Sequence, residues 1–234
     1  MFTVTCIGRN GLYPTKDEAT SGYLVDMDGM KILLDVGAGV FPRLLDMTLP
    51  EDLFAVVVSH FHGDHCADLA VFDYYLQSKR AALPLFAPTD NFYDVRDLRH
   101  FYYTETYDGY RVDIEGADLS FFRTAHPRLC MGVRITYGGK TLVYSADTNV
   151  CDWLDEALEG ADLAILDSAF DEQSYKQGGP HLSARLCGEY AKKHNVRTLL
   201  SHLNPTGDKE KLLSEAKEVS PLCEIIELKT YEIG

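Results

Sequence analysis

The hydrophobic and polar positions of this chain fall into two similar successions, each of apolar strands followed by amphipathic helices. In the first succession, the apolar runs predict strands over 2–7, 23–26, 31–35 and 54–58. A helix follows them, with Leu69, Phe72 and Leu76 at helical spacing. In the second succession, the predicted strands cover 119–124, 131–137, 141–145, 163–166, 196–201 and 223–228. The predicted helices cover 153–158, 183–193 and 209–218.

Turn residues between the runs support this division. Asp28-Gly29 and Gly138-Gly139 each separate two short apolar runs and predict β-hairpins. The sequence shows no internal repeat, linker or low-complexity stretch. The order of elements therefore predicts a single α/β domain over residues 1–234, with two sheets packed face to face and helices outside.

Composition and charge narrow the classes of function. The chain has 46% hydrophobic and 25% charged residues, which is typical of a globular protein. With 36 acidic and 22 basic residues its formal net charge is −14. This charge disfavours long polyanions such as tRNA, because their binding depends on basic contacts to phosphate. A small anionic substrate stays open, since bound metal ions can dominate the local field.

The apolar runs, residues 1–7 and the cysteines indicate the location of the protein and the redox state of its thiols. No apolar run reaches the length of a membrane-spanning helix, so we expect no contact with a membrane. Residues 1–7 are typical of a first strand rather than a signal peptide. The six cysteines are scattered without a C-x-x-C pair, which indicates reduced thiols and a cytoplasmic protein.

A cluster of candidate metal ligands comes directly after the apolar run at 54–58. His60, His62, Asp64 and His65 supply imidazole and carboxylate groups, which are good ligands for zinc and similar divalent ions. His60 and His62 alternate in an extended segment, so their side chains leave it on the same side. Cys66 follows the cluster, and we interpret it as a small core residue at a helix start rather than a ligand.

Three further candidates lie one or two residues past predicted strands. His126, Asp147 and His202 each occupy such a position, where a capping or turn residue would be the ordinary interpretation. Their repetition at strand ends favours metal ligation instead. His100 and His194 have no such position, and we expect them to be solvent-facing or hydrogen-bonded.

This set of residues resembles the metallo-β-lactamase superfamily of binuclear metal hydrolases, over essentially the whole chain. The resemblance implies a four-layer αββα sandwich with two mixed sheets face to face. It implies two divalent metal ions, zinc in the first instance, with manganese or iron as alternatives at the carboxylate-rich position. The nucleophile would be a hydroxide that bridges the two ions. Asp35 falls where the family has a supporting carboxylate, which orients a ligand imidazole.

The resemblance also assigns the ligands. One ion would be held by His60, His62 and His126, the second by Asp64, His65 and His202, with Asp147 bridging both. Asp64 would also take part in catalysis.

Several segments narrow the resemblance to ribonuclease Z and its phosphodiesterase relatives. They are residues 8–15, 19–24, 59–65 and 144–148. His181-Leu-Ser183 is similar to an additional His-x-Ser/Thr element of that branch, whose histidine assists the transition state or protonates the leaving oxygen. The alternative for His181 is an ordinary loop residue before a helix capped by Ser183. Asp167 falls where those enzymes carry a longer glutamate, so its pairing with His181 stays open.

One departure from ribonuclease Z affects the substrate. Ribonuclease Z carries a long basic arm for tRNA between the positions that match His126 and Asp147. Here residues 127–146 fill that connection and are mostly a strand hairpin. We therefore predict an arm-free phosphodiesterase that acts on small or cyclic phosphodiesters and does not process tRNA.

Other functions remain as alternatives. A thioesterase of the glyoxalase II kind would share all seven ligands without needing His181, and a non-catalytic metal-binding member would keep the fold alone. A β-lactamase is disfavoured because those enzymes are usually exported, and a flavodiiron oxidoreductase because a glutamate usually replaces the second histidine.

Residues 72–110 are rich in aromatics, which could line a substrate cleft, form a homodimer interface or belong to the core.

Overall fold

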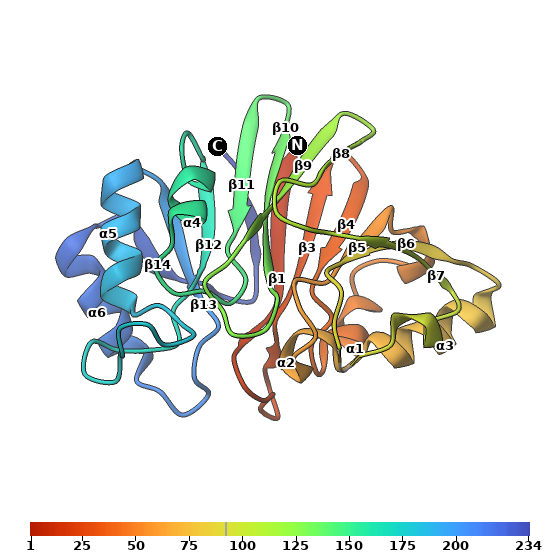
Figure 1. Cartoon of the computed structure of the whole chain (residues 1–234), viewed down its shortest axis with the longest axis horizontal. Coiled ribbons are helices and arrows are strands. Elements are labelled where there is room, and N and C mark those ends of the chain that lie inside the picture. The colour runs from red at the N-terminus through yellow and green to blue at the C-terminus, as the bar shows by residue number, and fades with distance from the viewer. Residues whose placement is uncertain (92) are drawn as a thin grey trace. The chain divides into compact units, whose positions relative to one another are not determined.

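The computed structural model describes residues 1–91 and 93–234. The chain divides into two compact units: Met1–Thr106 with Leu228–Glu232, and Tyr107–Glu227 with Ile233–Gly234. Each unit contains one mixed sheet with its own helices (Figure 1). This confirms the predicted α/β class with two mixed sheets, whereas the assignment of residues 1–234 to a single domain stays a prediction.

The sheet of the first unit has the strand order β15-β1-β3-β4-β5-β6-β7, with β2 paired to β1. Its strands are β1 (Phe2–Asn10), β2 (Ala19–Thr20), β3 (Gly22–Met27), β4 (Met30–Leu34), β5 (Ala55–Val57), β6 (Leu83–Ala87), β7 (Phe101–Glu105) and β15 (Thr230–Glu232). β1, β3 and β4 pair antiparallel, and β4 to β7 continue in parallel. Asp28 and Gly29 both have positive φ, as the tight turn between β3 and β4 requires.

The helices of the first unit cover its core. They are α1 (Val40–Leu44), α2 (Gly63–Cys66) and α3 (Leu69–Lys79), with short 3-10 turns at Pro50–Asp52 and Val95–Asp97. Leu69, Phe72 and Leu76 of α3 are buried in the apolar core, as their spacing predicted. Cys66 ends α2 and is buried in the same core, so it is a core residue.

The aromatic-rich segment 72–110 contains both buried and exposed aromatic side chains. Phe72 and Phe101 belong to the core, with their ring centroids 5.4 Å apart. Tyr74 on α3 and Tyr102 on β7 are exposed. Phe92, which belongs to the same aromatic run, lies outside the described residues. The core interpretation therefore holds for part of the segment, which also contains the strands β6 and β7 that the hydrophobic pattern did not predict.

The sheet of the second unit has the strand order β14-β13-β12-β11-β10-β9-β8. Its strands are β8 (Arg111–Ile114), β9 (Ala117–Arg123), β10 (Met131–Tyr137), β11 (Lys140–Tyr144), β12 (Leu163–Asp167), β13 (Arg197–Ser201) and β14 (Cys223–Ile225). β8 to β11 pair antiparallel and β11 to β14 pair parallel. Strand β14 is shorter than the predicted run over 223–228.

Helices cover this second sheet. They are α4 (Asp152–Ala157), which lies against the antiparallel strand β9, and α5 (Ala184–His194) and α6 (Lys209–Val219), which lie against parallel strands. α5 and α6 lie against one another and against β13 and β14 (Figure 1). The Ser183 hydroxyl accepts a hydrogen bond from the Leu186 amide, which caps α5 where the sequence predicted its start. A parallel bridge between Ser183 and Phe170 also holds the segment before α5, which carries His181, beside the loop that follows β12.

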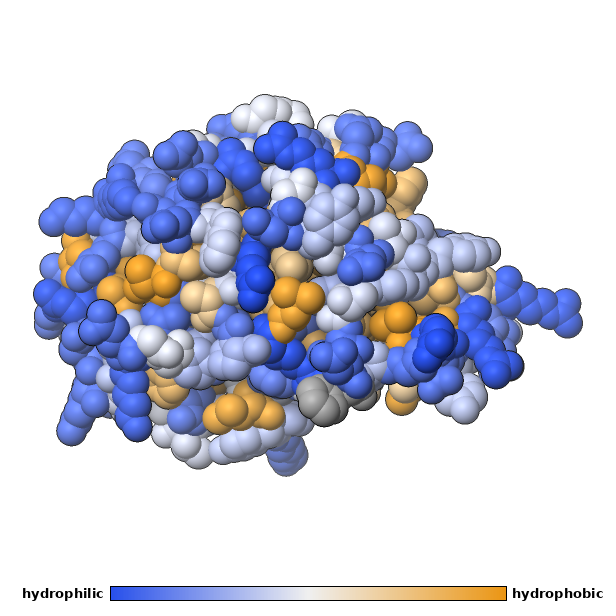
Figure 2. Space-filling model, viewed as in Figure 1, coloured by the Kyte–Doolittle hydropathy of each residue, from blue (hydrophilic) through white to orange (hydrophobic). Residues whose placement is uncertain are grey.

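The cysteines, the helices and the surface bear on the expectations of reduced thiols and of no membrane-spanning segment. All six cysteines are free, and all but Cys151 are buried. Burial raises the pKa of the Cys6 thiol to about 12. None of the described helices is long and apolar enough to cross a membrane. On the face seen in Figure 2, hydrophobic residues form small separate groups among hydrophilic ones.

Candidate metal centre

Two loops of the second unit are tied together where they carry candidate ligands. His126 follows β9 and Asp147 follows β11. The Thr124 hydroxyl donates to the carbonyl oxygen of Asp147 at 2.8 Å. The Asn149 amide donates to the carbonyl oxygen of Ala125 at 3.0 Å. Hydrogen bonds to backbone carbonyl oxygens thus hold the segments that carry His126 and Asp147 next to each other.

Four side chains converge in the second unit. Asp147, Asp167, His181 and His202 each offer one ligand atom, and these atoms all lie within 4.8 Å of one another. The rings of His181 and His202 stack with centroids 4.8 Å apart. His202 Nε2 lies 3.3 Å from an Asp147 carboxylate oxygen. The structure therefore brings together four of the residues that the sequence singled out.

Asp167 does reach His181 in spite of its short side chain. Nδ1 of His181 lies 2.8 Å from Oδ2 of Asp167, which also accepts the Thr148 amide at 3.0 Å. The other oxygen of Asp167 lies 3.5 Å from His202 Nδ1. A fully buried carboxylate at the end of β12 thus serves two histidines.

The charges of this pair shift each other's pKa. Burial alone would lower the pKa of His181, but the charge of Asp167 and its hydrogen bond raise it above its ordinary value. Burial alone would raise the pKa of Asp167, but the neighbouring histidines hold it below its ordinary value. The arrangement favours a protonated His181 beside an ionised Asp167.

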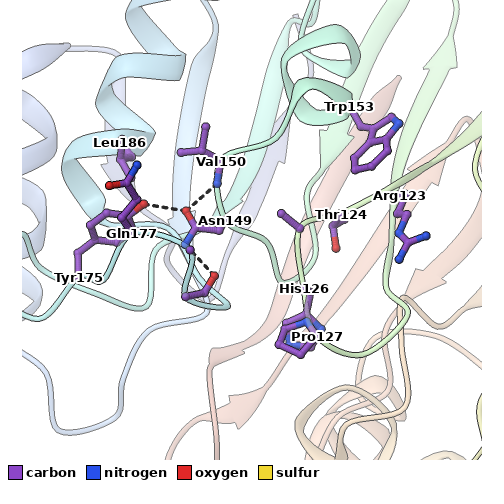
Figure 3. Close-up of a pocket in the computed structure, with 13 residues that line it drawn as sticks. Arg123, Thr124, His126, Pro127, Asn149, Val150, Trp153, Tyr175, Gln177 and Leu186 are labelled. Atoms are coloured by element: carbon purple, nitrogen blue, oxygen red, sulfur yellow. Dashed lines mark hydrogen bonds between the residues drawn. The ribbon is translucent and has the colours of Figure 1, made fainter.

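A pocket lies beside His126 in the second unit, and we call it the His126 pocket. It has a volume of about 860 Å³ and is lined by thirteen residues, drawn in Figure 3. In that view Arg123 and Trp153 lie on one side of the pocket, and Tyr175 and Gln177 lie on the other. None of these four residues was singled out by the sequence, because none has the type and spacing of a metal ligand.

Asn149 holds one wall of this pocket. Its side-chain amide nitrogen donates to the carbonyl oxygen of Gly179 at 2.8 Å. Its side-chain oxygen accepts from the Tyr175 hydroxyl at 2.8 Å and from the Val150 amide at 2.7 Å. Asn149 was also missed by sequence reasoning, although its place two residues after Asp147 was a signal.

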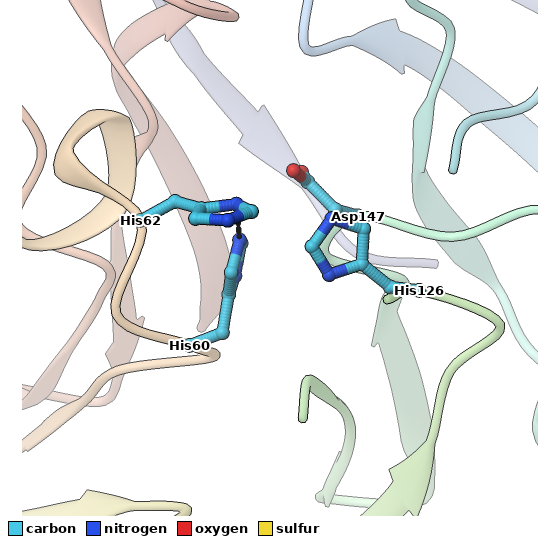
Figure 4. A group of neighbouring side chains, drawn as sticks. All are labelled: His60, His62, His126 and Asp147. Atoms are coloured by element: carbon cyan, nitrogen blue, oxygen red, sulfur yellow. Dashed lines mark hydrogen bonds between the residues drawn. The ribbon is translucent and has the colours of Figure 1, made fainter. Parts of the chain in front are cut away.

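The first unit carries its own group of histidines after β5. His60 Nε2 and His62 Nδ1 lie 3.0 Å apart, joined by the dashed line in Figure 4. The two side chains thus point toward each other, as alternation along an extended segment predicted. The ring of His65, on the short helix α2, lies 4.3 Å from that of His60. Asp64 precedes it on α2, and Asp64 Oδ2 accepts the Leu12 amide at 2.8 Å.

Asp35 orients His65, as expected for a supporting carboxylate. One oxygen of this fully buried residue lies 2.7 Å from His65 Nδ1 and accepts the Ser59 hydroxyl at 2.9 Å. The other accepts the Ser59 amide at 2.7 Å. With Nδ1 donating to Asp35, the Nε2 lone pair of His65 is the one that can bind a metal ion.

The donor groups suit divalent metal ions. In the second unit, His126 Nδ1 lies 3.1 Å from the carbonyl oxygen of Arg128, which again leaves Nε2 as the metal donor. Buried imidazoles with one nitrogen fixed, next to buried carboxylates, are typical of zinc and related sites. The group of Asp147, Asp167, His181 and His202 is therefore a candidate metal site within the second unit, and the histidines after β5 are further candidate donors in the first unit.

The two remaining histidines have ordinary hydrogen bonds. His100 Nδ1 lies 3.2 Å from a carboxylate oxygen of Asp73, and His194 Nε2 lies 2.6 Å from one of Asp155. Both agree with the expectation that these histidines are hydrogen-bonded.

Comparisons with known proteins identify relatives across the whole chain. A family model described as "Beta-lactamase superfamily domain" matches residues 30–202. The chain is 31% identical over 226 residues to probable metallo-hydrolase YhfI from Bacillus subtilis, which covers 92% of this chain and 93% of that protein. The crystal structure of YhfI matches with a TM-score of 0.93 at 30% identity, covering 100% of this chain and 99% of that one.

Ribonuclease Z proteins are also similar. Ribonuclease Z from Methanopyrus kandleri is 28% identical over 260 residues, which covers 92% of each protein. The short form of human tRNase Z matches with a TM-score of 0.80 at 18% identity, covering 99% of each chain, and this likeness shows a shared fold.

Proposed function

Because the chain belongs to the beta-lactamase superfamily and is a metallo-hydrolase of that superfamily, we propose that it is a binuclear metal-dependent phosphodiesterase. Its substrates would be small or cyclic phosphodiesters. The observation that carries the proposal is the hydrogen bond of 2.8 Å between His181 and Asp167. A phosphodiester expels an alkoxide, which needs a proton, whereas a thiolate leaves readily without one. A thioesterase of the glyoxalase II kind would therefore gain little from this pair.

We assign the ligands as the resemblance implies. One ion would be held by His60, His62 and His126, the second by Asp64, His65 and His202, with Asp147 shared. Family membership and the buried donors within each unit support this assignment. When bound, two such ions lower the pKa of a water molecule and polarise the substrate. Zinc suits the histidines best, and manganese or iron would suit the carboxylate-rich position.

Side chains of the protein would donate the proton that the leaving group needs. Nδ1 of His181 donates to Asp167, so the proton available for catalysis is the one on Nε2. From there His181 would protonate the leaving alkoxide oxygen, and its positive charge would offset charge on the phosphoryl oxygens. Asp167 would fix the ring and hold the imidazolium form.

The form of the connection after His126 supports a small substrate. Residues 127–146 contain only the hairpin of β10 and β11 with its approach segments, and the net charge is −14. Binding of tRNA needs a basic surface, which this composition does not favour. We propose that the chain does not process tRNA, and efficient cleavage of precursor tRNA by the purified protein would contradict this.

Two further assignments belong to the same proposal. We propose a homodimer, for which the exposed Tyr74 and Tyr102 are candidate contacts. We also propose a cytoplasmic location, which suits six free cysteines. Light scattering of the purified protein tests the first, since a monomer at micromolar concentration would contradict it.

A comparison of two substrates tests the function. Purified protein is assayed with bis(p-nitrophenyl) phosphate and with S-lactoylglutathione, before and after removal of metal with a chelator. The proposal predicts metal-dependent hydrolysis of the phosphodiester and at most trace activity on the thioester. The reverse preference would favour the thioesterase. Inactivity on a wide panel, with less than one equivalent of bound metal, would favour a non-catalytic member.

A further inference from the structure

The His126 pocket differs in charge from the rest of this acidic chain. The lining residues that the structure describes include Arg123 and His126 and no aspartate or glutamate. The chain as a whole has 36 acidic residues. A hollow without carboxylates, next to a guanidinium group, accepts an anionic ligand without the repulsion that most of this surface would impose.

Two lining side chains are available to a ligand. Trp153, on α4, is 40% exposed and is the only tryptophan of the chain. Arg123 ends β9, and its backbone amide is fixed by the Asp108 carboxylate at 3.1 Å. Neither the indole nitrogen nor the guanidinium group has a hydrogen bond or ion pair with any described residue. An exposed aromatic face together with an uncommitted cation suits a ligand that is both aromatic and anionic.

Hydrogen bonds within the protein hold the opposite wall of the pocket in place. Asn149 is buried, and its three hydrogen bonds hold the Tyr175 hydroxyl and the Gly179 carbonyl in place. Preformed pockets of about 300–1,000 Å³ are typical of small-molecule sites. The volume of about 860 Å³ lies in that range and exceeds what a phosphate group alone would fill. The pocket thus has room for the larger, non-reacting part of a substrate.

We propose that the His126 pocket binds the nucleoside part of a phosphodiester substrate, with Trp153 stacked on the base and Arg123 facing the phosphate. This inference rests on the proposed function, since His126 at the pocket's edge is one of the assigned metal ligands. It names the substrate class as nucleotide esters. Base stacking on an aromatic side chain changes affinity by about tenfold to hundredfold, so Trp153 would set specificity.

Tryptophan fluorescence tests binding without turnover. Emission at Trp153 reports on this pocket alone, because the chain has no second tryptophan. Metal-loaded protein is titrated with adenosine 5′-monophosphate, ribose 5-phosphate and inorganic phosphate. We expect saturable quenching by the nucleotide and at least about tenfold weaker responses to the other two. No response to the nucleotide, or equal responses to all three, would overturn the proposal whether or not the protein is a phosphodiesterase.

A matched pair of substrates tests specificity. Thymidine 5′-(p-nitrophenyl phosphate) and methyl p-nitrophenyl phosphate share a leaving group and differ in the nucleoside. Trp153→Ala should lower the ratio of kcat/KM for the two esters by about tenfold to hundredfold, mainly through KM of the nucleotide. Trp153→Phe, which keeps an aromatic face, should retain most of the ratio and serves if the alanine variant does not fold. Tyr102→Ala, a change of an exposed aromatic on β7, is the control and should leave the ratio unaltered.

The outcomes separate the two proposals. A ratio within about twofold of the parent's in both Trp153 variants overturns the nucleoside subsite while phosphodiesterase activity stands. Hydrolysis of neither ester contradicts the proposed function, and the fluorescence titration then decides the subsite by itself.

Discussion

Nδ1 of His181 lies 2.8 Å from Oδ2 of Asp167, and this carboxylate also accepts the backbone amide of Thr148. The buried aspartate thus fixes the ring of His181 from a strand end of the same unit. A histidine held in this way presents a defined tautomer to a substrate. The relationship gives the first two predictions.

Replacement of the histidine separates proton transfer from metal binding. His181→Ala should lose about 10²–10⁴ in kcat on alkyl phosphodiesters and much less on esters of p-nitrophenol, whose phenolate leaves without a proton. Bound metal, measured by mass spectrometry, should stay at the parent's level. His100→Ala, which removes a hydrogen-bonded histidine elsewhere, is the control. Unchanged rates on alkyl esters would exclude the acid role.

Replacement of the aspartate changes the pH dependence. Because Asp167 raises the pKa of His181, the acid form persists to higher pH, and activity falls as the pH rises through that pKa. In Asp167→Asn burial is the largest remaining influence and lowers the pKa of His181, so the alkaline limb of kcat on alkyl esters should move to lower pH. A pH–rate profile of both proteins measures this. An alkaline limb at the same pH in both would contradict the role of Asp167.

Asp35 offers a test of metal retention. Asp35→Asn replaces the charged partner of His65 Nδ1 with a neutral one and should weaken binding of metal by about 10–100-fold. Competition with a fluorescent chelator measures the affinity. Asp46→Asn, at an exposed aspartate of the same unit, should bind metal as the parent does. Equal affinities in the two variants would show that Asp35 does not support a ligand.

Asn149 offers a test of loop positioning. Asn149→Ala leaves the Gly179 carbonyl and the Tyr175 hydroxyl without this partner and should lower the free energy of unfolding by about 1–3 kcal/mol. Tyr175→Phe removes one of the same bonds and should cost less. In urea unfolding, the double variant should be less destabilised than the sum of the single variants. Additive effects would argue against a shared network.

The sequence predicted the elements whose periodicity is strong. The bounds of β10 agree with the predicted strand 131–137, and α5 and α6 begin and end within a residue or so of the predicted helices. The strands β6 and β7 were missed, because Pro84 interrupts the apolar run of β6 and parallel strands lack the alternation of half-buried ones. β15 was missed because its pairing with β1 joins opposite ends of the chain.

The candidate site was predictable only where chemistry restricts the residue type. His126, Asp147 and His202 were predicted as ligands because each lies just past a strand and because that position repeats along the chain. Trp153 and Arg123 could not, because an exposed tryptophan acquires a role only from the pocket that it faces. The position of Asp167 was predicted from the sequence, but whether its short side chain reaches His181 could be decided only from the distance in the structure.

The central claim is that two metal ions act together in the hydrolysis of a phosphodiester. Its most direct test is titration of zinc into metal-stripped protein while hydrolysis of bis(p-nitrophenyl) phosphate is followed. The account predicts no activity without metal and a rise that levels off at two equivalents of zinc. Full activity in the stripped protein, or at one equivalent or less, would contradict it.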